Sequence, residues 1–557
     1  MGGVPSPGWS APPGRSQQPH PVPAASREQA TALRHALLAA GYDVARVQER
    51  LGPPAATALE RGEQVPALLA TRSGDALDTL IRLLLLGRAL PAARVQSVVS
   101  WLPGLVPGLL LPAGAHRVRA SVEISPYAQD SYVVSDHRPR RRAMRADHVV
   151  GVGSASLTLV AATLRGQVGS ALDVGTGCGI QALHLVTHSG RVTATDTNPR
   201  ALALAALTLA LSGVEAELLA GGMWEPVAGR RFDLVVANPP FVVGPARLTY
   251  RDSGLPGDEV SRRVVAGAAH HLTEGGVAQV LASWLHRPGE DWHERVAAWL
   301  PTGCDALVLQ REVLDPPAHV ALWLDDEGLD DEGWDHEWDN EGFEDEGGGT
   351  EGGGTDALGE EPSGVDPRQS REGRQSREGR EGYERRYAAW LDDLTAQGVG
   401  GIGFGMVVLR RTSGSPTIRM VDARDWADPM TAARIHGWLA RIEQLRPCAD
   451  GGLEHARLRR APGLVMHRSL VPGGEDGWRQ ESVRLTVPEG LPQDVVIDDV
   501  LAQVVGAVDA GLPLAVLADL IVAATGEQQA ADRLVPAVRA LVEAGHLLVA
   551  DRRPPAQ

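Results

Sequence analysis

Between Leu157 and about Arg411 the chain alternates short apolar runs with longer helical patterns, and this alternation constrains the fold more than any other feature. The apolar runs are rich in Val, Leu and Ala and are bounded by Gly, Pro or Asp, which is typical of buried strands. Strands that alternate with helices form a parallel sheet with helices on its faces. We therefore predict a doubly wound, Rossmann-like α/β domain over residues 147–411. Its strands are expected at 170–174, 191–195, 216–219, 232–237, 277–282, 306–310 and 403–409.

The regions on either side have different patterns. Residues 1–26 have no apolar core and predict a disordered tail instead of a signal peptide, and residues 27–146 predict a helical, winged-helix-like accessory domain. Residues 412–495 read as a linker with a small mixed region. Residues 496–557 predict helix, Pro-started helix, helix and strand, the outline of a winged helix. These flanking regions could read nucleic acid, or they could serve as scaffold or dock a partner.

The acidity of the chain is concentrated in one segment. The formal net charge is −17, and Asp325 to Glu361 alone contains 17 Asp and Glu with no Arg. Low aliphatic content and self-repulsion predict that residues 325–382 form a disordered insert within the α/β domain.

The three cysteines are too far apart for a disulfide framework or a zinc site, which is typical of a reducing compartment. The apolar runs are too short or too interrupted by Pro and Gly to cross a bilayer. We expect a cytoplasmic protein with no metal. Its oligomeric state stays open.

The first predicted strand ends in the sequence ALDVGTGCGI. Glycines at alternate positions let the backbone approach a ligand where a strand turns into a helix. The spacing differs from the G-x-G-x-x-G of nicotinamide-binding folds. The second strand ends in Asp196, 23 residues after Asp173, and an acid there can bind ribose hydroxyls. The candidate ligand-binding residues are Asp173, Gly175, Thr176, Gly177, Gly179 and Asp196.

The strand at 232–237 ends in Asn238-Pro239-Pro240-Phe241. Neither proline can donate to a sheet ladder, and residues before proline are held extended, so the motif predicts a stiff corner where pairing stops. In open α/β sheets this carboxyl edge is where ligands bind.

Together, these three strand ends resemble class I S-adenosylmethionine (SAM) methyltransferases that modify planar nitrogens. The resemblance is closest to peptide-release-factor glutamine methyltransferases and to the small-methyltransferase-domain enzymes of rRNA. It implies that Asp173 and the glycine loop hold the methionine part of SAM, Asp196 the ribose, and the Asn-Pro-Pro-Phe motif the acceptor. Gly222 stands where the family usually has an acid, so adenine is expected at the Met223 backbone and Trp224.

The Asn-Pro-Pro-Phe motif suits the methylation of an –NH₂ group. The lone pair of an amide or aromatic amine is delocalised, so the nitrogen is a poor nucleophile. The Asn238 side-chain oxygen and the Pro239 carbonyl can each accept one N–H, which turns the lone pair toward the methyl group. Phe241 offers a flat face to the acceptor.

The resemblance favours a protein glutamine of release-factor type as the substrate, with a release factor or ribosomal protein as partner. One alternative is the exocyclic amine of a base in rRNA, tRNA or DNA, favoured by the flanking domains and by the arginines of residues 138–145. A non-enzymatic regulator that binds SAM or nucleic acid is the second alternative.

Overall fold

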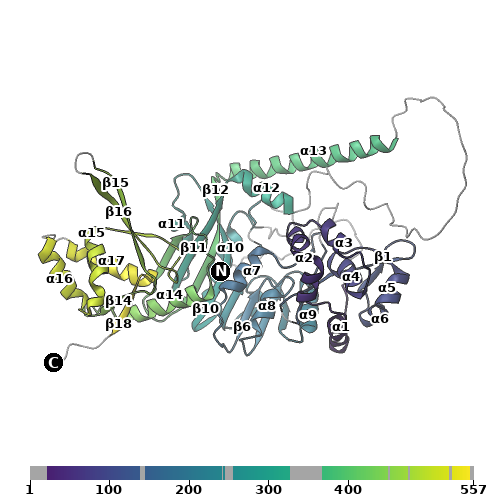
Figure 1. Ribbon diagram of the computed structural model, residues 1–557, viewed down its shortest axis with the longest axis horizontal. Helices are drawn as coiled ribbons and strands as arrows, with labels where there is room; N and C mark the ends of the chain where they lie inside the picture. The colour runs from purple at the N-terminus through teal and green to yellow at the C-terminus, as the bar shows by residue number, and fades with distance from the viewer. Residues whose placement is uncertain are drawn as a thin grey trace, which may run out of the picture. The chain divides into compact units, whose positions relative to one another are not determined.

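The computed structural model describes residues 22–128, 130–137, 145–240, 242–244, 255–326, 367–448, 452–473, 477–525 and 530–551 (Figure 1). It consists of two compact units. Unit 1 comprises Met1–His137 with Ala203–Val214, and unit 2 comprises Arg138–Leu202 with Glu215–Gln557. No helix in these described ranges is long and apolar enough to cross a membrane.

Unit 2 is built on an eight-stranded sheet in the order β13-β11-β12-β10-β9-β6-β7-β8. Its pairings are parallel except for those of β12, which runs antiparallel to both β10 and β11. A mostly parallel α/β sheet confirms the predicted Rossmann-like class, and every predicted strand is present. The strands are β6 (Ala171–Val174), β7 (Val192–Asp196), β8 (Glu217–Ala220), β9 (Phe232–Ala237), β10 (Leu272–His286), β11 (Cys304–Leu314), β12 (Gly401–Arg411) and β13 (Ile418–Asp422).

The connecting helices bury the faces of this sheet. One core cluster joins Phe232, Trp284 and Trp292 to the aliphatic residues of β6, β9, β10 and α10, and Trp284 stacks on Trp292 at 5.5 Å between ring centroids. The helices of unit 2 in this region are α7 (Ser154–Ala162), α8 (Ile180–Leu185), α10 (Glu259–Ala268), α11 (Trp292–Ala297), α12 (Pro316–Asp326) and α13 (Pro367–Ala396), with short turns η2 (Glu225–Val227) and η3 (Ala269–His271). Helix α9 (Pro199–Leu211) begins in unit 2 and belongs to unit 1 from Ala203 onward.

Two predicted boundaries in this region are wrong. The sheet does not end at residue 411, because β13 continues it by pairing parallel to β11 from Ala306↔Ile418 to Gln310↔Asp422. The insert predicted as disordered over residues 325–382 is helical in its described parts, since α12 extends to Asp326 and α13 begins at Pro367. Proline suits a first helical turn, and the Arg, Gln and Glu residues that follow are good helix formers.

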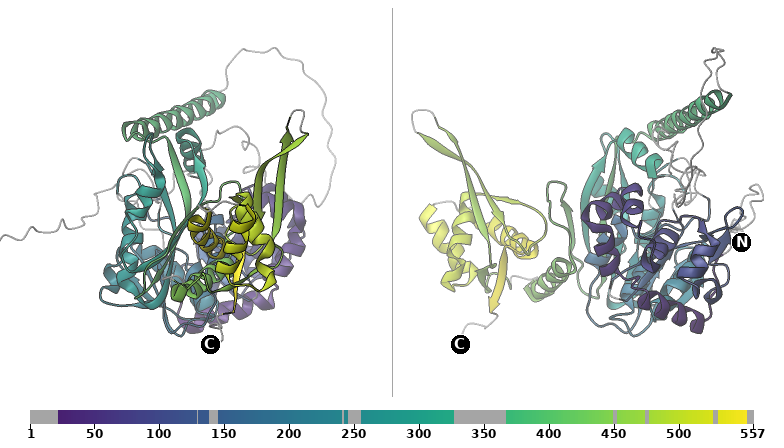
Figure 2. Two further views of the ribbon diagram at one scale, coloured as in Figure 1. Left: turned by 90° about the vertical axis from the view of Figure 1, so that its left-hand side faces the viewer. Right: turned by 45° about the vertical axis from the view of Figure 1, so that its right-hand side comes forward.

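The rest of unit 2 follows β13. Helices α15 (Asp499–Ala507), α16 (Leu514–Thr525) and α17 (Ala530–Ala544) and strand β18 (Leu547–Asp551) have the predicted order, and β18 pairs with β14 (Arg457–Arg460). The hairpin of β15 (Val465–Pro472) and β16 (Trp478–Thr486) projects away from these helices (Figure 2). The remaining elements are α14 (Ala432–Leu445), η4 (Arg446–Cys448), β17 (Val495–Ile497) and η6 (Val508–Ala510). A winged helix at this end stays a prediction.

Unit 1 is mainly helical and has two small sheets, and the winged helix expected within residues 27–146 stays a prediction. Ser26 caps α1 through a capping box with Gln29. A three-stranded sheet has the order β1-β3-β2, and β4 pairs with β5. The elements are α1 (Arg27–Ala39), α2 (Val44–Glu60), α3 (Val65–Ala70), α4 (Ala76–Leu80), η1 (Ile81–Leu85), β1 (Leu90–Pro91), α5 (Ala92–Val98), α6 (Leu102–Leu105), β2 (Leu110–Pro112), β3 (Arg117–Ala120), β4 (Glu123–Pro126) and β5 (Tyr132–Ser135).

Candidate active site

The sheet register brings the three predicted strand ends together. Val174 at the end of β6 pairs with Ala237 of β9 on one side and with Thr195 of β7 on the other. The next residues along these three strands are Gly175, Asn238 and Asp196. Because the strands are parallel, these residues lie next to one another at the carboxyl edge of the sheet. The three sequence motifs therefore lie together at one edge of the sheet.

The glycine loop leaves open space above the end of β6. Gly175 and Gly177 have φ of 75° and 55°, and no heavy atom lies within 4 Å of a Cβ built on either residue. The loop is tied to β7, because the backbone N–H groups of Gly175 and Thr176 both donate to the Thr195 carbonyl at 2.9 Å. Glycine tolerates these positive φ values and lets a ligand approach the backbone.

Asp173 lies buried beneath this loop. Its Oδ2 accepts hydrogen bonds from Thr176 Oγ1 at 2.7 Å and from the Ala182 backbone N–H at 3.2 Å. Its Oδ1 is buried and has no hydrogen-bond partner among the described residues. Burial raises the pKa of this carboxyl to about 7. A buried carboxyl oxygen without a partner fits a ligand that brings a donor or a positive charge.

Asp196 has a structural role beyond the predicted one. Its Oδ2 accepts from the Gly177 N–H at 2.9 Å, and its Oδ1 accepts from the Asn198 N–H at 2.8 Å. Burial raises its pKa. Each carboxylate oxygen keeps a second lone pair, so Asp196 can hold the glycine loop and still accept ribose hydroxyls. Asn198, which the sequence analysis missed, donates from Nδ2 to the Asp147 carbonyl at 3.0 Å.

The side chain of Asn238 is oriented by Ser156, a residue that the sequence analysis missed. Asn238 Nδ2 donates to Ser156 Oγ on α7 at 3.3 Å, and Gln181 Nε2 on α8 holds the Ser156 carbonyl at 2.9 Å. With its amide nitrogen engaged in this way, Asn238 keeps Oδ1 available as an acceptor. Pro239 is buried and Pro240 is exposed, whereas Phe241 lies outside the described residues.

The loop after β8 has two distinct candidates for contacts with adenine. Met223 has a φ of 47°, which is unusual for a residue other than glycine, and Gly221 before it donates to the Asp196 carbonyl at 3.0 Å. The Trp224 ring stacks on His271 at 4.8 Å between centroids, and its Nε1 donates to the Arg263 carbonyl at 3.4 Å. One face of the indole is therefore already covered. Contacts of either residue with a cofactor stay predictions.

Among the described residues, no group of three or more His, Cys, Asp and Glu side chains could hold a metal ion. Of the arginines at 138–145, only Arg145 is described, and its Nε pairs with Asp147 Oδ1 at 2.7 Å.

Residues 147–287, which include this site, match the family model of the methyltransferase small domain. Residues 39–121 and 436–549 match two models described as domains of unknown function, DUF7059 and DUF7782. The first match supports the class I methyltransferase resemblance and supports SAM as the cofactor of this domain.

A segment of 117 residues is similar to curated proteins named ribosomal RNA small subunit methyltransferase C. The identity is 32% with that of Salmonella choleraesuis (strain SC-B67) and 33% with that of Citrobacter koseri. The segment is 21% of this chain and 31% of each relative, so the chain spans less than a third of the relatives' length.

Among solved structures, an rRNA methylase from Streptococcus thermophilus matches at 16% identity and TM-score 0.21, over 30% of this chain and 91% of that chain. A methyltransferase from Pyrococcus furiosus matches at 20% identity and TM-score 0.23, over 32% and 83% of the two chains. Likenesses this weak carry no argument about function.

Proposed function

We propose that this protein transfers the methyl group of SAM to an exocyclic amine of a base in ribosomal RNA. The observation that carries the proposal is the register of β6, β7 and β9, which brings the glycine loop, Asp196 and Asn238 together at one edge of the sheet. The similarity to rRNA methyltransferases favours RNA as the substrate.

The residues around the edge fit the cofactor. Asp173 Oδ1, a buried oxygen without a partner, suits the ammonium group of the methionine end, and the open space at Gly175 and Gly177 suits the backbone approach of a ligand. Asp196 retains acceptor capacity for the ribose. The bound cofactor supplies an electrophilic methyl group, and the protein's task is to orient the nucleophile.

Asn238 and Pro239 would perform that task. Asn238 Oδ1 and the Pro239 carbonyl accept the two N–H groups of the base amine, which directs its lone pair at the methyl group. This interaction strengthens as the nitrogen becomes tetrahedral. It therefore stabilises the transition state more than the bound substrate, and so it lowers the activation barrier of methyl transfer. Ser156 holds the Asn238 amide in the required orientation. A base in a helix would have to leave the stack to reach this corner.

A protein glutamine, the first choice of the sequence analysis, presents the same –NH₂ geometry. The comparisons give it no support, because the curated relatives are named as rRNA methyltransferases. We therefore place the rRNA base first.

The test is methyl transfer from tritium-labelled SAM to small-subunit rRNA, small subunits and release factors, taken from a strain that lacks the gene. Nucleoside mass spectrometry of labelled rRNA should show an N-methylated base, and Asn238→Ala should slow the labelling on the order of a hundredfold. Label in a release factor alone would refute the rRNA substrate. Label that the Asn238→Ala variant transfers at the wild-type rate would refute the mechanism.

A further inference from the structure

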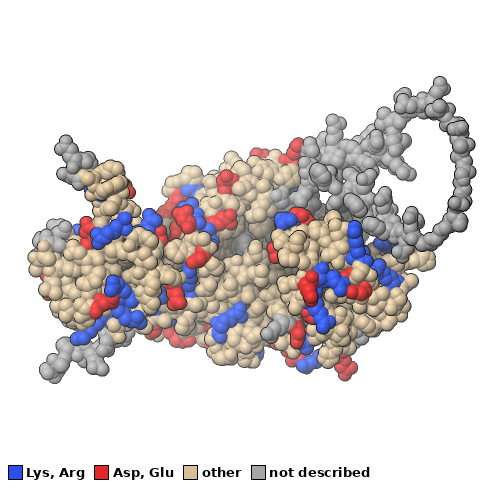
Figure 3. Space-filling model, in the orientation of Figure 1, with Lys and Arg blue, Asp and Glu red and all other residues tan. Residues whose placement is uncertain are grey.

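Unit 1 carries a group of arginines that the proposed site does not use. Arg72 follows α3, Arg82 lies in η1, Arg88 precedes β1 and Arg94 lies in α5. We call these four residues the arginine cluster. Figure 3 shows basic and acidic side chains side by side on the visible face of unit 1. Whether a given arginine is neutralised therefore depends on the ion pairs that it forms with neighbouring acids.

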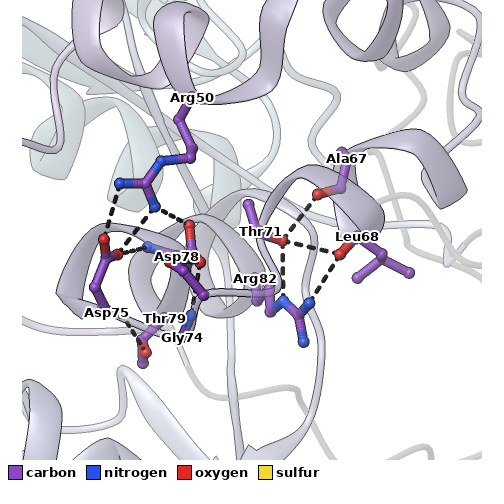
Figure 4. Close-up of polar contacts among 10 residues, drawn as sticks. Arg50, Ala67, Leu68, Thr71, Gly74, Asp75, Asp78, Thr79 and Arg82 are labelled. Atoms are coloured by element: carbon purple, nitrogen blue, oxygen red, sulfur yellow. Dashed lines mark hydrogen bonds and ion pairs between the residues drawn. The ribbon is translucent and has the colours of Figure 1, made fainter.

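The nearby acids are already engaged. Asp78 is fully buried, and its Oδ2 accepts from Ser73 Oγ at 2.6 Å and from the Gly74 N–H at 2.7 Å. Asp75 Oδ1 accepts the Asp78 N–H at 2.9 Å, and Arg50 pairs with both carboxylates (Figure 4). This network holds the loop between α3 and α4 in place, and Arg50 compensates its carboxylates.

In the part of the chain that the structure describes, neither Arg82 nor Arg94 forms an ion pair with an acidic side chain. Arg82 donates to two neutral acceptors, Thr71 Oγ1 at 2.9 Å and the Leu68 carbonyl at 2.8 Å (Figure 4). Arg94 lies against Gly74, where a Cβ would overlap its guanidinium. Its Nε and Nη2 are buried and have no hydrogen-bond partner among the described residues. Buried donors without partners cost stability until an acceptor arrives.

The electrostatics of Arg82 agree with this geometry. Burial is the largest cause that lowers the pKa of Arg82, and the positive charge of Arg94 is the second. The charges of Arg88 and Arg72 lower this pKa further, whereas the charge of Asp78 raises it. Three of the four charged groups that act on Arg82 are therefore arginines. An anion placed among these groups would relieve their repulsion and accept from the vacant donors.

We propose that the arginine cluster binds phosphate groups of the RNA backbone and so anchors the substrate of the methyltransferase. Guanidinium groups form planar, bidentate hydrogen bonds with phosphate, which suits them to this role. Arg82, Arg88 and Arg94 are half-buried and Arg72 is exposed, so the cluster reaches the surface at Arg72, while Nε and Nη2 of Arg94 lie below it. The choice of RNA rests on the proposed function.

The experiment measures binding of the full-length protein to deproteinised small-subunit rRNA, without SAM, from low to high salt. Arg94→Gln and the double variant Arg72→Gln/Arg94→Gln should bind more weakly. Their slopes of log affinity against log salt should fall by roughly 0.7–0.9 for each lost phosphate contact. Arg94→Lys should restore part of the affinity. Arg61→Gln is the matched control, because Arg61 is an exposed arginine of unit 1 that pairs with Glu63.

A wild-type slope in Arg94→Gln, with an unchanged melting temperature, would show that Arg94 is structural and would overturn the proposal. Weakening by Arg61→Gln equal to that of Arg94→Gln would also overturn it, since binding would then follow net charge alone. The two proposals fail separately. Asn238→Ala should lower kcat, whereas the Arg94 variants should raise KM for rRNA and leave kcat unchanged.

Discussion

Replacing Asp196 by Asn tests whether the end of β7 binds the ribose. The asparagine keeps the size of the side chain and one acceptor oxygen, but it removes the negative charge. The wild-type carboxylate holds the Gly177 and Asn198 N–H groups, so Asp196→Ala would disturb the glycine loop as well as the ligand. Asn keeps one of these two acceptors, so it disturbs the loop less than Ala does.

The expected loss follows from the hydrogen bonds proposed for the carboxylate. A hydrogen bond to a charged group contributes about 1.5–3 kcal/mol, and every 1.4 kcal/mol changes the dissociation constant about tenfold. If one ribose bond is lost completely, because the amide NH₂ of Asn replaces the acceptor oxygen, Asp196→Asn should weaken binding by roughly 10- to 150-fold. A second affected bond would add to this loss.

Two ligands separate the ribose from the methionine end. S-adenosylhomocysteine carries both parts, whereas 5′-methylthioadenosine lacks the amino-acid part. Calorimetry should show that Asp196→Asn weakens both ligands by similar factors. Asp173→Asn should weaken S-adenosylhomocysteine alone, because only that ligand brings an ammonium to the vacant Oδ1. Asn at position 173 can still accept from Thr176 and Ala182 through its oxygen, so it serves as the matched control.

Unchanged affinity of Asp196→Asn for 5′-methylthioadenosine, in a variant with the wild-type melting temperature, would refute the ribose assignment. Equal loss of both ligands in Asp173→Asn would refute the division of the site between the two carboxylates.

Four further outcomes are expected. Affinity for S-adenosylhomocysteine should rise severalfold from pH 6 to pH 7.5 in the wild type and not in Asp173→Asn, because the pKa of Asp173 is about 7 and an ammonium favours its ionised form. Asn238→Ala should keep SAM affinity and cut turnover on the order of a hundredfold, whereas Ser156→Ala should cut it less and Ser156→Thr should restore it. Urea unfolding should show that two buried histidines lower the stability at pH 5 relative to pH 7, against the opposite contribution of Asp173, whose raised pKa lets the folded chain take up a proton in this range. Burial lowers the pKa of His319 and His546 to about 4, so the unfolded chain takes up protons below about pH 6.5 that the folded chain excludes, which costs about 2 kcal/mol for each histidine. Replacing residues 327–366 with a short Gly/Ser linker should leave SAM affinity and the melting temperature nearly unchanged, and a large loss of either would contradict the prediction that this segment is disordered.

Much of the site was predictable because its signals are local. A Pro-Pro pair ends a strand through its own covalent geometry, and alternate glycines permit positive φ wherever they occur. The α/β alternation follows from short apolar runs that cannot bury themselves alone. The residues Asp173, Asp196 and Asn238 could therefore be placed at strand ends before any contact was known.

The sequence was less informative at boundaries and in flanking regions. β13 is a short run after a polar loop, and it becomes a strand because β11 offers an unpaired edge. The Arg- and Glu-rich repeat was assigned to disorder on composition, although its residues have good helix propensity. Composition describes the average of a segment, whereas a helix depends on how each residue suits its position.

By itself, the sequence determined which residues stand at the carboxyl ends of the strands, because strand ends are set by neighbours in the chain. The tertiary structure alone decided which partners those residues meet. Ser156 reaches Asn238 across 82 positions. Arg94 reaches Gly74, and β12 runs antiparallel between β10 and β11, only once the elements have packed. These contacts depend on strand order and helix packing. Both are set by the burial of apolar surface over the whole unit, so a local sequence pattern does not predict them.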